Sequence, residues 1–236
     1  MPNISLQPAF ILFTRAYKDT SMLLELFGED YGRFSVIARG VKGVKKSTCG
    51  SLQPFIPLLI SCKGKGELLN LVYYEVLHHM LSLRGNSLYA GFYLNELIMY
   101  LLPKYDQHKT LYQYYKTALL SLANGFHQQV LRKFEKQLLE ELGYGLLPKI
   151  SVDKYCIKPD VYYRFVPTVG LQELPITTSV NNYIYLGKNL VSIAEDAWHD
   201  QGALLTAKYL FRQVLMFLLN GKKINSRNFF LTGKIC

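Results

Sequence analysis

One stretch of the chain, residues 33–66, carries basic side chains without a single Asp or Glu. Glycines lie between these cations and let the backbone approach a ligand closely. Cations beside accessible backbone N–H groups bind phosphate, so the predicted chemistry is the binding of a polyanion without recognition of bases. The alternative is an ordinary solvated surface. The predicted contacts in this stretch are Arg33, Arg39, Lys42, Lys45, Lys46, Lys63 and Lys65.

Residue types used in catalysis are present but are not arranged for it. The five histidines lack the H-x-x-x-H spacing of a zinc protease, and the chain has neither a nucleophile elbow nor a P-loop. Asn95 and Glu96 interrupt an apolar helical pattern, where we expect them to bond to neighbouring loops. The sequence therefore predicts a protein that is not an enzyme and needs no cofactor.

The cysteines predict neither disulfides nor a metal site. Cys49, Cys62, Cys156 and Cys236 are scattered without a C-x-x-C pair, which favours reduced thiols in a cytoplasmic protein. No basic residue precedes Arg15, and the apolar run near the amino terminus is only five residues long, so we expect neither a secretory signal nor a membrane span.

The overall charge points to an anionic partner. Lys and Arg number 27 against 17 Asp and Glu, a formal net charge of +10. This excess favours nucleic acid, an anionic membrane surface or an acidic protein tail, and charge alone does not choose among them. No acidic residue follows Asp200, so three cations near the end of the chain are also predicted contacts: Lys222, Lys223 and Arg227.

The elements that must position these residues begin with a barrel. Five short strand-like segments lie between residues 9 and 76, and this density of strands predicts a small closed barrel of the OB type. Residues 32–40 alternate so that Arg33 and Arg39 fall on the outer face of a strand. Three aromatic residues could stack on bases or belong to the barrel core, namely Tyr31, Phe34 and Phe55.

Helical patterns follow the barrel. Residues 86–102, 109–125 and 128–145 predict three consecutive helices in an antiparallel bundle. Residues 148–186 predict loop with short strands, and helical spacing returns near residue 191. The expected class is α+β, with three parts: an OB-fold domain at 1–80, a helical bundle at 81–147, and a carboxyl-terminal region at 148–236 packed on the bundle.

A series of motifs in the order FILFTRAYKDTSMLLELFGEDYGRFSVIARGVKG, GSLQPFIPLLISCKGKGEL, GFYLNEL, LLEELGYG and LNGKKINSRNF runs over nearly the whole chain. This series resembles the bacterial recombination mediators of the RecO family. The resemblance implies an amino-terminal OB-fold, a helical bundle, and a carboxyl-terminal part that holds a four-cysteine zinc finger in some members. Around Cys156 the other expected cysteines are missing, so the chain resembles a zinc-free member with a degenerate zinc-finger position.

The resemblance also implies a function in DNA repair and recombination, in the RecFOR pathway. Members bind single- and double-stranded DNA, anneal complementary strands, and act with RecR to load RecA onto DNA covered by single-strand-binding protein. Such a protein would lie in the cytoplasm at the nucleoid. A basic barrel could neutralise two strands at once, and base pairing would then drive annealing without a nucleotide.

Members of the family also hold the acidic carboxyl-terminal tail of single-strand-binding protein. A tail that ends in an aromatic residue and a free carboxylate needs an apolar slot with cations beside it. By resemblance we expect this slot in LRKFEKQLL, with Arg132 on the carboxylate, and the predicted contacts are Leu131, Arg132, Lys133 and Phe134. The alternative is an amphipathic helix with snorkelling basic side chains.

Two other functions stay open on the sequence. The chain could be a protein-binding adaptor whose cations capture acidic tails. It could also be an RNA-binding protein, because an OB barrel binds either nucleic acid.

Overall fold

The computed structural model describes residues 3–41, 50–77, 81–145, 157–175 and 181–232. The chain divides into two compact units. Residues 1–126 and 224–236 form the first, which we call the barrel unit, and residues 127–223 form the second, which we call the α6 unit. The domain boundaries expected at residues 80 and 147 stay predictions.

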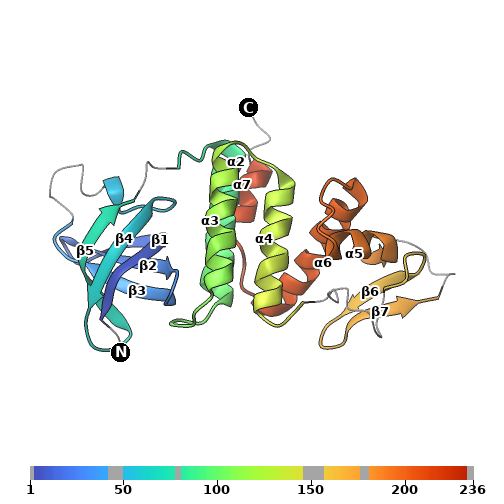
Figure 1. Ribbon diagram of the computed structural model, residues 1–236, viewed down its shortest axis with the longest axis horizontal. Helices are drawn as coiled ribbons and strands as arrows, with labels where there is room; N and C mark the ends of the chain where they lie inside the picture. The colour runs from blue at the N-terminus through green and yellow to red at the C-terminus, as the bar shows by residue number, and fades with distance from the viewer. Residues whose placement is uncertain (1–2, 42–49, 78–80, 146–156, 176–180, 233–236) are drawn as a thin grey trace. The chain divides into compact units, whose positions relative to one another are not determined.

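The barrel unit begins with five strands that close into a barrel (Figure 1). Their order around the barrel is β1-β2-β3-β5-β4, and β3 with β5 is the parallel pair among otherwise antiparallel neighbours. This is an OB-like barrel, and the predicted class is confirmed. The strands are β1 (Ile4–Tyr17), β2 (Ser21–Gly28), β3 (Gly32–Ala38), β4 (Pro57–Lys63) and β5 (Leu68–Val76).

Alternating apolar side chains fill the barrel. Leu24 lies opposite Val36 and Leu26 opposite Phe34, and all four side chains are fully buried. Burial of an apolar side chain of this size stabilises the fold by roughly 1.5–3 kcal/mol. Cys62 of β4 is also buried, and the loss of solvation raises the pKa of its thiol to about 12.

Helices of the barrel unit pack against the outer surface of β1 and β2. These are α2 (Gly85–Leu101) and α3 (Lys109–Ala123), and the short α7 (Ser226–Thr232) packs on α2. The ring of Phe10 lies 5.3 Å from that of Tyr115, and the ring of Phe27 lies 5.5 Å from that of Tyr112. Aromatic contacts at these distances fix α3 against the barrel.

The polar residues inside α2 have structural roles. Asn95 is buried, its Nδ2 donates to the carbonyl oxygen of Leu12 at 2.8 Å, and its Oδ1 accepts from the Tyr115 hydroxyl at 2.6 Å. Glu96 accepts from the backbone N–H of Ser226 at 2.9 Å, at the start of α7. Both residues bond to neighbouring segments, as expected, but the partners of Asn95 lie on β1 and α3 rather than in loops.

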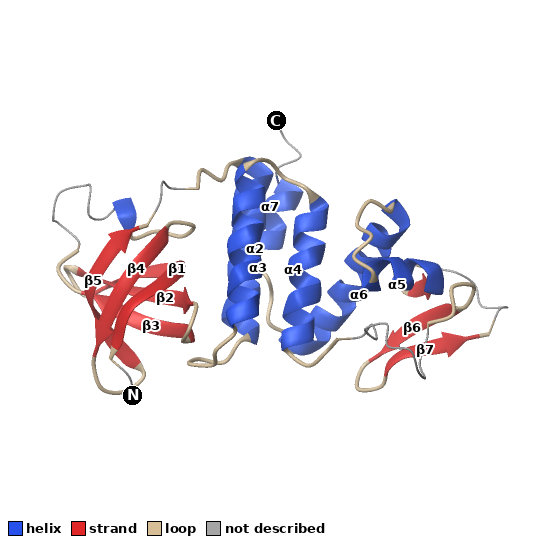
Figure 2. Ribbon diagram, viewed as in Figure 1, coloured by secondary structure: helices blue, strands red, loops and turns tan. Residues whose placement is uncertain are grey.

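The α6 unit combines helices with a small sheet. Figure 2 shows the β6 and β7 hairpin, and β8 pairs with the other edge of β6. The helix α6 packs against α4, α5 and β6. The elements are α4 (Gln128–Glu141), β6 (Tyr162–Val166), β7 (Gly170–Leu174), β8 (Ile184–Leu186), α5 (Gly187–Ala194) and α6 (Gln201–Leu219).

Packing accounts for the apolar character of α6. By length and composition this helix could cross a membrane, and no other helix among the described residues meets that criterion. Its buried stripe includes Ala207, Leu210 and Val214, which is what a core helix requires. The Asp200 side chain accepts from the Gly202 N–H at 2.8 Å and caps its first turn.

Candidate nucleic-acid interface

Two basic residues, Arg39 and Lys63, flank Asn70 of β5, and a third, Lys65, lies in the turn that follows β4. Arg39 directly follows β3, and its Nε donates to Oδ1 of Asn70 on β5 at 2.8 Å. Lys63, the last residue of β4, pairs with Asn70 in the β4–β5 ladder. Arg39, Lys63 and Lys65 are exposed, and we call these three residues the basic rim.

The turn between β4 and β5 presents backbone as well as charge. Gly66 adopts φ +93°, a conformation that a residue with a side chain rarely adopts. No atom lies within 4 Å of a Cβ built on Gly66, so the backbone conformation rather than a clash selects glycine there. A ligand can therefore approach the main chain beside Lys65, as a phosphate requires.

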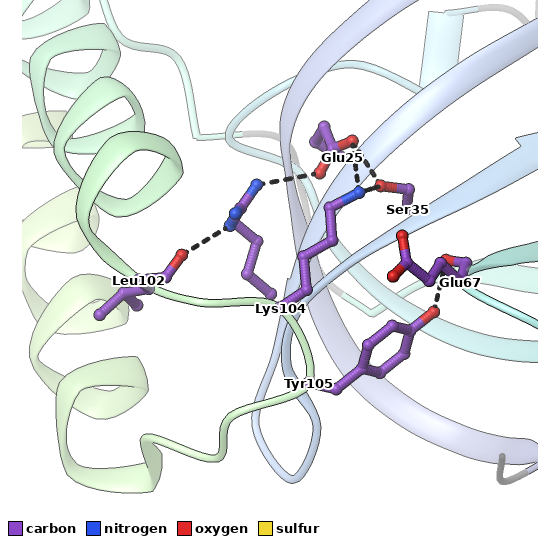
Figure 3. Close-up of polar contacts among 7 residues, drawn as sticks. Glu25, Ser35, Glu67, Leu102, Lys104 and Tyr105 are labelled. Atoms are coloured by element: carbon purple, nitrogen blue, oxygen red, sulfur yellow. Dashed lines mark hydrogen bonds and ion pairs between the residues drawn. The ribbon is translucent and has the colours of Figure 1, made fainter. Parts of the chain in front are cut away.

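Arg33 lies away from the basic rim, in an ion-pair network on the outer face of β2 and β3. Its side chain is only 16% exposed, with Nη1 at 3.5 Å from Oε2 of Glu25 and Nε donating to the carbonyl oxygen of Leu102 at 3.1 Å. Lys104 lies 3.8 Å from Glu25 and donates to the hydroxyl of Ser35 (Figure 3). Arg33 therefore joins the barrel to the end of α2, and its guanidinium is engaged within the protein.

The segment that supplies Lys104 covers this face. Residues 103–108, which we call the strap, connect α2 to α3. The N–H of Tyr105 donates to the carbonyl oxygen of Arg33 at 2.8 Å, and its hydroxyl donates to the carbonyl oxygen of Glu67 at 2.7 Å (Figure 3). An isolated parallel bridge joins Arg33 to Lys104, so the strap continues the barrel wall beside β3.

The strap leaves little of the outer face of β3 accessible. Ser35 and Ile37, which the alternation places outward, are 3% and 7% exposed. Gly32 adopts φ +61°, and a Cβ built on it would lie 1.6 Å from the carbonyl oxygen of Asp106. The β2–β3 face is a frequent ligand site in OB-folds, but here the strap occupies it.

The other predicted DNA contacts are separated along the chain. Lys42, Lys45 and Lys46 lie outside the described residues. Lys222 and Lys223 are exposed in the α6 unit. Arg227 belongs to the barrel unit, where its guanidinium lies 5.3 Å from the ring centre of Tyr93 and Nη2 donates to the Tyr93 hydroxyl at 3.2 Å. This last contact shows a packing role for Arg227.

The four residues predicted for the acidic tail lie on α4. Leu131 and Phe134 are buried, at 6% and 1% exposure. Nη2 of Arg132 lies 3.0 Å from Oε1 of the buried Glu135, and Lys133 is exposed. The apolar members are thus core residues, and Arg132 already has a carboxylate partner.

Sequence reasoning missed Asn70 and Lys18. Asn70 interrupts the apolar segment LLNLVYY with a polar side chain, and this interruption could have identified it from the sequence. Lys18 is exposed in the β1–β2 turn; since Tyr17 pairs with Ser21 and Met22 with Ala38, the turn lies at the end of the barrel where Arg39 follows. Both residues extend the polar surface around the basic rim.

The described residues contain no group of three His, Cys, Asp or Glu side chains that could hold a metal ion. Cys156 lies outside those residues, as do Cys49 and Cys236. Nothing in the described chain therefore supplies a ligand set for zinc.

Two family models match the chain in succession. Residues 1–80 match the model for the amino-terminal part of recombination protein O, and residues 83–161 match the model for its carboxyl-terminal part. The first match spans the barrel strands, and the second begins just before α2.

Curated relatives are similar over almost their full length. DNA repair protein RecO of Coxiella burnetii is 40% identical over 226 residues, which cover 95% of this chain and 97% of the relative. DNA repair protein RecO of Tolumonas auensis is 37% identical, with 98% and 96% covered, and that of Dechloromonas aromatica is 35% identical, with 97% and 96% covered. The chain therefore belongs to the RecO family of DNA repair proteins.

Proposed function

We propose that this chain is a recombination mediator that binds single- and double-stranded DNA through the basic rim. The observation that carries the proposal is that Arg39 and Lys63 flank Asn70 on the wall of an OB-like barrel, with Lys65 exposed in the adjoining turn. Cations at such a surface contact phosphate and carry no sequence information. Lys42, Lys45 and Lys46 are additional proposed contacts, as are Lys222 and Lys223.

Strand annealing follows from this binding. Two DNA strands repel each other through their phosphates, and cations that neutralise both strands lower the repulsion. Base pairing then supplies the free energy. No covalent bond forms or breaks, so the proposed activity is not enzymatic and requires no metal or nucleotide cofactor.

The proposed partners follow from family membership. The chain would act with RecR, at the nucleoid, to load RecA onto DNA covered by single-strand-binding protein. The acidic tail of that protein would contact α4, where Lys133 is the exposed cation. Arg132 could take the tail carboxylate only by exchanging its ion pair with Glu135.

Salt-dependent binding of a labelled oligonucleotide tests the proposed surface. The logarithm of the binding constant falls by about 0.7 for each phosphate neutralised on a single strand, per unit of log salt concentration. Lys63→Ala should reduce the slope by about 0.7, and a variant with alanine at Arg39, Lys63 and Lys65 should reduce it by about 2. Fluorescence anisotropy between low and moderate salt provides the measurement.

The matched control is Lys116→Ala, which removes an exposed cation on α3 away from the rim and should leave the slope unchanged. A folded triple variant with the wild-type slope would refute the surface. Binding of an acidic, aromatic-ended peptide without binding of oligonucleotide would favour an adaptor. Preference for an RNA strand over a DNA strand of equal length would favour the RNA-binding alternative.

A further inference from the structure

The outer face of β4 and β5 carries an exposed aromatic side chain next to the basic rim. Tyr73 of β5 pairs with Ser61 of β4, and Lys63 lies two residues beyond Ser61 on the same strand. Residues two apart on a strand share a face and lie about 7 Å apart. Tyr73 is 44% exposed, and the side chain opposite it is small.

More apolar surface surrounds Tyr73. Leu6 is 58% exposed, and its N–H donates to the hydroxyl of Ser61 at 3.0 Å, which places this part of β1 beside the same strand pair. Val72 is 53% exposed where the β4–β5 register shifts between Ser61 and Cys62. An exposed apolar patch with cations at its edge is the arrangement by which proteins hold single strands: bases stack on the ring while phosphates contact the cations.

The aromatic side chains that the sequence offered for stacking are less accessible than Tyr73, and Tyr31 is partly buried against the barrel core. Phe34 and Phe55 are buried, at 0% and 5% exposure, so their rings belong to the core. The strap covers the β2–β3 face, where Ser35 is almost completely buried. Tyr73, by contrast, is exposed and lies close to Lys63 in the strand register.

We propose that Tyr73 is the base-stacking residue for a single strand whose phosphates are held by Arg39 and Lys63. The inference rests on the proposed DNA binding and deepens it. Stacking on Tyr73 requires unpaired bases, because the bases of a duplex are already stacked on one another and do not offer a free face. The occupant of the β4–β5 face is therefore single-stranded nucleic acid.

Glu75 orients the side chain of Tyr73. The Tyr73 hydroxyl donates to Oε2 of Glu75 at 2.7 Å, which orients the ring. This hydrogen bond is the largest cause of an upward shift in the pKa of Tyr73. The same carboxylate repels phosphate, so replacing it with an amide should tighten binding.

Oligonucleotides with 2-aminopurine test the inference, because stacking changes the fluorescence of this base. Loss of an aromatic stacking partner costs about 5- to 150-fold in affinity, and an exposed site should fall near the lower limit. Tyr73→Ala should weaken single-strand binding about fivefold and abolish the fluorescence change. The dependence of the logarithm of the binding constant on log salt concentration should stay unchanged, as should the affinity for duplex DNA, since no charge is removed.

Two further variants sharpen the test. Tyr73→Phe keeps the ring and should retain single-strand affinity, whereas Glu75→Gln should increase it. Wild-type single-strand affinity in folded Tyr73→Ala would overturn the stacking role. If the rim variant still loses binding in that case, only the inference about Tyr73 fails. If the rim variant also binds like the wild type, the proposed DNA surface itself is wrong.

Discussion

Gly32→Ala should detach the strap, and Gly40→Ala provides a matched control. Both glycines have positive φ, +61° and +67°, so each substitution costs about 1–2 kcal/mol for placing a side chain in the left-handed region. A Cβ on Gly40 has no atom within 4 Å, whereas one on Gly32 would lie 1.6 Å from the carbonyl oxygen of Asp106. Only the first variant must therefore displace the strap.

The additional cost can be worked from the contacts that the strap makes. Displacement breaks the hydrogen bonds from the Tyr105 N–H to Arg33, from the Tyr105 hydroxyl to Glu67, and from Arg33 Nε to Leu102. At about 1 kcal/mol each, their loss lowers the free energy of unfolding of Gly32→Ala by about 3 kcal/mol more than that of Gly40→Ala.

Urea unfolding followed by circular dichroism measures this difference, and hydrogen exchange gives a local measurement. The Tyr105 amide should exchange slowly in the wild type and in Gly40→Ala, and rapidly in Gly32→Ala, because its acceptor is the Arg33 carbonyl at 2.8 Å. Equal unfolding free energies for the two variants, with an equally protected Tyr105 amide, would refute the claim that the strap closes the β2–β3 face.

Two further predictions concern the junction of α2 and α3. Asn95→Ala should lower the free energy of unfolding by about 2–3 kcal/mol, because the Leu12 carbonyl and the Tyr115 hydroxyl lose their partner; a loss below about 0.5 kcal/mol would contradict this. Burial raises the pKa of Tyr115 well above its ordinary value near 10. The Tyr115 phenol then ionises at a lower pH in the unfolded chain than in the folded protein. Its contribution to the free energy of unfolding is therefore fully present below pH 10 and decreases above pH 10, by up to about 1.4 kcal/mol per pH unit. Melting temperatures between pH 9 and 11 should fall less steeply in Tyr115→Phe, and parallel profiles would contradict the assignment.

The elements of the barrel could be predicted because their signals are local. Period-two alternation in residues 32–38 locates β3. The role of Asn95 could also be predicted, since a polar residue inside an apolar helix must find a partner.

The interface could be predicted only in part, because distant segments decide which cations are accessible. Arg33 and Arg39 are both outward-facing basic residues of one strand pattern, yet Arg33 pairs with Glu25 while Arg39 stays exposed. No local pattern shows that residues 103–108 return to cover β3. Likewise, Leu131 of the predicted tail site lies on an amphipathic face that serves equally well as core.

Annealing of two complementary labelled strands tests the central claim most directly. The wild-type chain should pair the strands faster than they pair alone, and alanine at Arg39, Lys63 and Lys65 should remove most of the acceleration while Lys116→Ala keeps it. Equal annealing rates for the wild type and a folded triple variant would contradict the claim that the basic rim binds DNA.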